Sequence, residues 1–164
     1  MRVGKNSRHS KRVIDGYRFL SSGVVFRSIL ILLLWSLLTT AWAGGSCVVA
    51  KRQGDSLAIE WQASFSDSAV SAMEKAKKRL LDQGFRKKGQ DVHAQASSDL
   101  PHAYLVIVKT VYTTLRGRPR TSYGCGFSPV SAGEAERAAL YDLRNYSWGW
   151  KPEFGYEVIE RFRY

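Results

Sequence analysis

The first 43 residues constrain the fold most, because they read as an export signal and not as part of a folded domain. The segment has a basic stretch that ends at Arg27, an apolar run from Ile29 to Leu38, and the small-residue exit Ala41-Trp42-Ala43. The apolar run is about ten residues long, which is short for crossing a hydrocarbon core of about 30 Å. We therefore expect cleavage after Ala43, so that residues 44–164 fold as one small exported domain.

The same leader has a second interpretation. No charged residue lies between Arg27 and Lys51, and so long an uncharged stretch is compatible with a retained membrane anchor. The predicted localisation is the periplasm or the secreted fraction, with a membrane-anchored form as the alternative.

The net charge of +11 does not indicate a nucleic-acid partner. The leader alone carries seven Lys and Arg residues against a single acid, Asp15, so more than half of the positive charge belongs to it. We expect no nucleic-acid ligand for the exported part.

The two cysteines, Cys47 and Cys125, both follow the predicted cleavage site. An even count in an exported domain predicts one disulfide, and closing so long a loop would stabilise the fold by about 4 to 5 kcal/mol. The alternative is a thiol-dependent enzyme that uses Cys125 as nucleophile, with His93 or His102 as its base. That alternative requires a free thiol.

Strand-like and helix-like patterns alternate along the exported part. Strands are predicted at 47–50 and 57–65, the second with apolar residues at every other position, and helical spacing follows from 69 to 83. Residues 85–101 are predicted as a loop with a short strand at 91–96. The remaining elements are predicted as strands at 103–114 and 121–127, a helix capped by Ser128 with Pro129 first and running to Asn145, and a last strand at 154–164.

This order, ββα-ββα-β, predicts an α+β fold with one antiparallel sheet of about five strands and two helices packed on one face. Residue 61 set against residue 123 pairs Phe65 with Phe127, Ser66 with Ser128 and Ala76 with Ala138. An internal duplication explains these matches, and independent use of the same cap and core residues explains them equally well.

Residues 126–128 (Gly-Phe-Ser) and 135–140 (Ala-Glu-Arg-Ala-Ala-Leu) resemble the last strand and final helix of double-stranded-RNA-binding domains. The resemblance covers about forty residues and implies a nucleic-acid-binding domain as an alternative function. That family carries a lysine cluster at the start of this helix to hold phosphates, where this chain has Pro129-Val130-Ser131-Ala132.

Basic residues outside the leader fall into two groups. The first is the candidate patch for an anionic ligand: Lys75, Lys78, Arg79, Arg86, Lys87 and Lys88. The second is a hairpin tip with Arg116, Arg118 and Arg120. Each group is also typical of an ordinary solvated surface. The aromatic residues Tyr146, Trp148, Trp150 and Phe154 could stack on a sugar or peptide or, alternatively, close the core.

The sequence contains no recognisable catalytic, metal-binding or cofactor-binding constellation. We therefore expect a non-enzymatic, disulfide-stabilised domain without a cofactor. Its expected partner is a protein of the cell envelope or an anionic surface such as lipid, lipopolysaccharide or an acidic glycan.

Overall fold

The computed structural model describes residues 43–164, so the predicted signal, its cleavage and its alternative as an anchor lie outside the described residues. The elements are β1 (Gly44–Arg52), β2 (Asp55–Ser64), α2 (Ala69–Asp82), β3 (Gln90–Ser98), β4 (Tyr104–Thr113), β5 (Pro119–Ser128), α3 (Ala132–Tyr146), the 3-10 turn η1 (Pro152–Phe154) and β6 (Glu157–Arg163). Within this part of the chain, no helix is long and apolar enough to cross a membrane.

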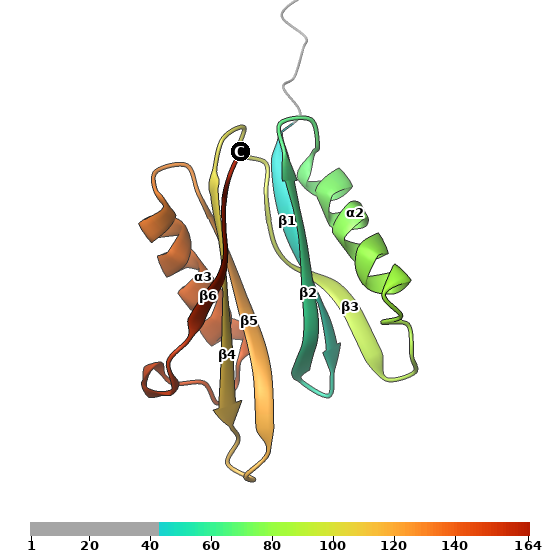
Figure 1. Cartoon of the computed structure of the whole chain (residues 1–164), viewed down its shortest axis with the longest axis vertical. Helices are drawn as coiled ribbons and strands as arrows, with labels where there is room; N and C mark the ends of the chain where they lie inside the picture. The colour runs from blue at the N-terminus through green and yellow to red at the C-terminus, as the bar shows by residue number, and fades with distance from the viewer. Residues whose placement is uncertain (1–42) are drawn as a thin grey trace, which may run out of the picture. The chain divides into compact units, whose positions relative to one another are not determined.

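The strands form two antiparallel three-stranded sheets, in the orders β2-β1-β3 and β5-β4-β6. Figure 1 shows the two sheets next to each other, with α2 on the outer side of one and α3 on the outer side of the other. The α+β class is confirmed. The predictions of a single sheet and of two helices on one face are wrong, because the strands divide into two sheets and each sheet has its own helix. The short strand predicted at 91–96 lies within β3, which is longer and occupies much of the predicted loop.

The central strand of each sheet is buried on both faces, which explains the layered arrangement. In β1, Val48 packs under α2, while Cys47 belongs to the cluster between the sheets. In β4, Val108 packs under α3, while Ile107 faces the opposite sheet. A strand that is apolar on both faces needs cover on both, and a helix outside with a second sheet inside supplies it.

The two halves repeat one topology, because each is a ββαβ unit with its first strand in the centre. Both ladders to the last strand of the unit are interrupted at the same place, between Cys47 and Val48 in one and between Ile107 and Val108 in the other. The buried helix positions match as Ala72 with Ala135, Ala76 with Ala139 and Leu80 with Leu143. This pairing is shifted by one residue from the sequence alignment, and the shared topology favours an internal duplication.

Both helices begin at a serine whose side chain accepts a backbone N–H. The Ser68 hydroxyl accepts from Ser71 at the start of α2. At α3 the cap is Ser131, which accepts from Glu134, so the helix begins later than the predicted start at Ser128 and Pro129. The Ser131-x-x-Glu134 spacing is that of a capping box, whereas Ser128 is the last residue of β5.

Candidate functional site

The predicted disulfide joins the two sheets. Cys47 of β1 and Cys125 of β5 are bonded, with their Cα atoms 6.4 Å apart, and both are buried. The bond therefore crosses the interior between the sheets, where Leu105 and Ile107 surround it. Cross-linking residues that lie far apart in the chain stabilises the fold chiefly by restricting the unfolded state.

The disulfide also bears on the alternative in which Cys125 is a nucleophile. A bonded sulfur carries no thiol, and residues 43–164 contain no free cysteine. The histidines considered as its base have other neighbours: His93 lies 2.9 Å from the Asp91 carboxylate, and His102 packs edge-on against Phe65. The structure thus brings together none of the groups that this alternative requires.

A buried polar cluster lies beside the disulfide, where β3, β5 and α3 meet. The Asp142 carboxylate accepts the N–H of Cys125 (2.9 Å) and the side-chain amide of Gln95 (2.7 Å), and this amide also donates to the Tyr123 carbonyl. Burial raises the pKa of Asp142, although these hydrogen bonds and the nearby Lys51 act in the opposite direction. Because these groups bond to one another and cover the free edge of β5, we assign the cluster a structural role.

The six basic residues of the predicted anionic patch lie on α2 and on the turn that follows it. Three of them are within ion-pair distance of an acid: Lys75 of Asp67 (2.5 Å), Arg79 of Glu60 (3.1 Å) and Arg86 of Asp82 (3.2 Å). The remaining three, Lys78, Lys87 and Lys88, form no ion pair with the described residues. Half of the predicted patch is therefore paired with local carboxylates, which weakens its field.

The second basic group meets the exposed aromatic loop in space. Residues 113–120 of the β4–β5 hairpin and residues 148–154 of the loop between α3 and β6 line a hollow of about 490 Å³, and we call these two segments the basic tip. The hollow is lined by Thr113, Thr114, Leu115, Arg116, Arg118, Arg120, Trp148, Gly149, Lys151 and Phe154. The sequence showed both groups but not that they share one site.

A tight turn fixes the hairpin half of the basic tip. The Thr114 N–H donates to the Arg118 carbonyl (2.9 Å), and the Gly117 N–H donates to the Thr114 carbonyl (2.8 Å). Gly117 has φ 72°, in the left-handed region that glycine adopts without strain. This turn places Leu115 and Arg116 at the end of the hairpin, away from the core.

The loop half of the basic tip is fastened to β4. The Gly155 carbonyl accepts from the Thr110 hydroxyl (2.8 Å) and from the Trp150 ring N–H (3.1 Å). The ring of Phe154 lies 6.2 Å from that of Tyr112. These contacts order the loop without covering its other aromatic residue, Trp148.

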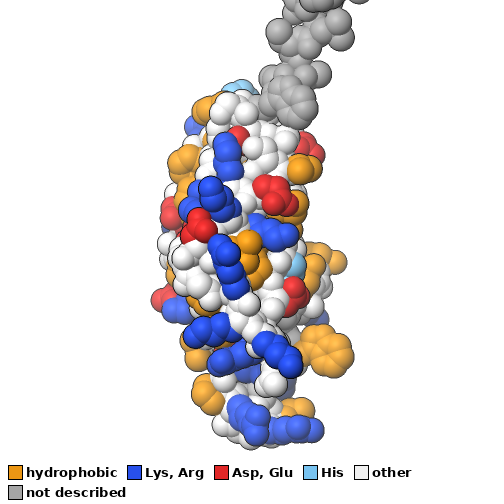
Figure 2. Space-filling model, turned by 90° about the vertical axis from the view of Figure 1, so that its right-hand side faces the viewer, with side chains coloured by type: hydrophobic (Ala, Val, Ile, Leu, Met, Phe, Trp, Pro, Cys, Tyr) orange, Lys and Arg blue, Asp and Glu red, His pale blue; other side chains and the backbone are white. Residues whose placement is uncertain are grey.

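The basic tip combines unpaired cations with fully exposed apolar side chains. The exposed fractions of Trp148 and Leu115 are 99% and 108%. Arg116, Arg118, Arg120 and Lys151 form no ion pair with any residue of the described part. Figure 2 shows Lys and Arg but no Asp or Glu at the lower end of its face, which is the end where the β4–β5 turn lies in Figure 1.

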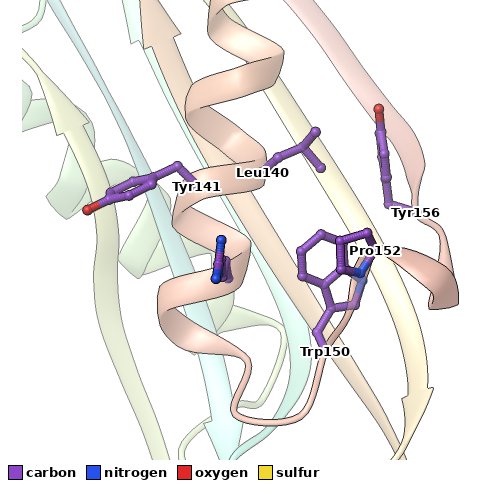
Figure 3. Close-up of a pocket in the computed structure, with 6 residues that line it drawn as sticks. Leu140, Tyr141, Trp150, Pro152 and Tyr156 are labelled. Carbon is purple, nitrogen blue, oxygen red and sulfur yellow. The ribbon is translucent and has the colours of Figure 1, made fainter.

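A second hollow, of about 310 Å³, lies between α3 and the segment that leads into β6. Leu140 of α3 lines it opposite Trp150 and Pro152, as Figure 3 shows. Two of its polar side chains are already bonded within the protein, since the Trp150 ring N–H donates to Gly155 and the Tyr156 hydroxyl donates to Glu136. We attribute this hollow to the packing of the loop on the helix.

The start of α3 offers little to a nucleic acid. Its first turn carries Glu134, which lies 3.4 Å from Arg137, so the nearest charge to the helix N-terminus is negative. The strands between the two helices are divided between the sheets, with β3 in one sheet and β4 and β5 in the other.

No cluster of three or more His, Cys, Asp or Glu side chains that could hold a metal ion occurs in residues 43–164.

No known family model matches the chain, and neither a curated protein nor a solved structure matches it. Its function must therefore be argued from the chemistry of its own surface.

Proposed function

We propose that the protein is an exported, disulfide-stabilised binding domain, and not an enzyme, which attaches to anionic surfaces through its basic tip. The observation that carries this proposal is the gathering of four unpaired cations and two fully exposed apolar side chains in two adjacent, ordered loops. The buried disulfide supports export, because such bonds persist in oxidising compartments.

Charge supplies the attraction in this proposal. The lining of the hollow contains Arg116, Arg118, Arg120 and Lys151, and the two loops contain only one acid, Glu153. Each base close to an anionic surface contributes about 1 kcal/mol, and salt weakens the contribution as the Debye length falls from about 10 Å at 0.1 M to about 3 Å at 1 M. The patch on α2 is the weaker candidate, because half of its bases have acidic partners.

The test compares charge reversal at two places on the same chain. We expect the oxidised protein to bind immobilised heparin, a sulfated polysaccharide, at low salt and to elute as salt is raised. The triple variant Arg116→Glu, Arg118→Glu, Lys151→Glu should elute at much lower salt. Its matched control, Lys78→Glu, Lys87→Glu, Lys88→Glu, changes the net charge equally. The control should elute at a salt concentration well above that of the tip variant.

Three results would contradict the proposal. If the protein binds neither heparin nor another anionic surface at low salt, the basic tip is only a solvated surface. If both triple variants lose the same amount of binding, the overall charge of the domain governs retention and the tip has no special part. A larger loss in the control would assign binding to α2 and its following turn instead. The thermal midpoint of each variant verifies folding, and it should change little because exposed charges contribute little to stability.

A further inference from the structure

We infer that the surface bound by the basic tip is an anionic lipid bilayer, into which Leu115 and Trp148 insert while the surrounding cations contact lipid phosphates. This inference rests on the proposed function, since it names the partner of the same site. It also gives a role to the two exposed apolar side chains, which attraction between charges alone would not require.

Leu115 gives the first argument. It lies in the β4–β5 turn with its side chain fully exposed, next to Arg116 and close to Arg118 along the chain. A polysaccharide offers an aliphatic side chain no partner, because sugars stack on aromatic rings and bond to polar groups. The hydrocarbon region below the lipid headgroups does offer an apolar partner, and the transfer of a leucine side chain from water into it is favourable.

Trp148 gives the second argument, because it reaches the same hollow from a different loop. Its exposed fraction of 99% means that the protein itself buries almost none of the indole. Tryptophan is enriched where a bilayer meets water, since its large ring is apolar and its N–H remains able to bond near the headgroups.

The basic tip places apolar and cationic side chains next to each other. The apolar side chains of Leu115 and Trp148 are fully exposed, Arg116 and Arg118 are exposed in the same turn as Leu115, and Lys151 is exposed in the same loop as Trp148. Insertion of the first two therefore brings cations to the level of the phosphates. Charge and apolar insertion are the two signals that together give stable attachment, whereas one alone gives weak and reversible binding.

The experiment measures binding to vesicles of phosphatidylcholine and phosphatidylglycerol in equal parts, with pure phosphatidylcholine vesicles as reference. The protein is used as the producing cell accumulates it, so every variant has the same N-terminus. The double variant Leu115→Ser, Trp148→Ser keeps all charges and should bind the anionic vesicles at least about tenfold more weakly. Its control, Val70→Ser, Tyr141→Ser, removes two exposed apolar side chains from the helices and should bind normally.

Heparin retention and fluorescence complete the test. Heparin elution of the Leu115→Ser, Trp148→Ser variant should be unchanged, because no charge is lost. Vesicles should shift the tryptophan emission of the protein to shorter wavelength, and Trp148→Phe should reduce that shift.

Each contrary result separates the two proposals. Heparin binding without vesicle binding overturns the bilayer inference and leaves the proposed function intact. Vesicle binding that is equal in the Leu115→Ser, Trp148→Ser variant also overturns it, since adsorption then depends on charge alone. Failure to bind both heparin and vesicles at low salt overturns the proposed function together with the inference.

Discussion

At the scale of single residues, Asp142 is a carboxyl group whose pKa is raised by burial. Its carboxylate is largely enclosed between α3 and β5, and the Cys125 N–H and the Gln95 amide donate to the same oxygen. Burial dominates over these hydrogen bonds and raises the pKa of Asp142 above its ordinary value of 3.8. The charged form of Asp142 therefore lowers the stability of the fold relative to the protonated form.

This shift predicts a pH dependence with a definite sign. A carboxyl group whose pKa is raised in the folded state stabilises the fold below 3.8, and this contribution is lost as pH rises through the raised pKa. Asp142→Asn keeps an oxygen that can accept from Cys125 and does not titrate. We expect the difference in unfolding free energy, wild type minus Asp142→Asn, to decrease as pH is raised from 3 towards 7, as measured by urea denaturation. A difference that grows with pH would contradict the assignment.

At the scale of elements, the closest packing is between β5 and α3. Gly124 and Gly126 have no side chain, and this lets the carbonyls of Ala139 and Ala135 lie directly on the strand. Cys125 stands between these glycines and points to the opposite side, into the disulfide. One short sequence, Gly-Cys-Gly, thus brings a helix and a second sheet against the two faces of the same strand.

Gly126→Ala should therefore be costly. A Cβ atom at this position would overlap the Ala135 carbonyl, so α3 must move away from β5. We expect a loss of about 3 kcal/mol in unfolding free energy, or a failure to fold. The matched control is Gly133→Ala within α3, where a Cβ meets only the Ser131 hydroxyl at 3.9 Å, and helix propensity should raise stability by up to about 1 kcal/mol. Equal effects of the two changes would show that the close approach does not matter.

Much of the element order could be predicted from the sequence, because local periodicity identifies strands and helices wherever one face is buried. β2, α2, β4 and β5 lie within a few residues of their predicted ranges. β3 was expected mainly as a loop, since its residues Gln90–Ser98 are polar and small and show little alternation. Its single buried residue, Gln95, bonds across to β5, a tertiary contact that no local pattern contains.

Strand partners were harder to predict than strands. The apolar runs at 47–50 and 105–108 do indicate burial on both faces, and that signal argues against one sheet with a bare side. The basic tip combines two segments with 27 residues between them, 121–147, so its sequence signals remained separate. Only the turn at Gly117 and the fastening of the loop through Gly155 bring them to one end.

At the scale of the whole molecule, the predicted export signal ends where β1 begins. β1 starts at Gly44, which pairs with Ser64 of β2, directly after the expected cleavage site. A bulky residue immediately before that site should block processing, because small residues are required there.

Intact-mass measurement of the protein from the producing cell checks this prediction. We expect the mass of residues 44–164, and we expect Ala43→Leu to accumulate as the uncleaved chain. Recovery of only full-length wild-type chain, in the membrane fraction, would favour the retained anchor. The disulfide should be intact in the processed protein, and a thiol assay under denaturing conditions serves as the control for export.

Gly44 and the basic tip lie at opposite ends of the domain. β1 begins at the end of the molecule opposite to the β4–β5 turn (Figure 1), and the ten residues of β4 at about 3.3 Å each separate these ends by about 30 Å. A domain that touches a surface with its basic tip therefore stands upright on it, with its first strand facing outward. If the leader is retained as an anchor, the chain therefore enters the domain at the end farthest from the surface that the basic tip contacts.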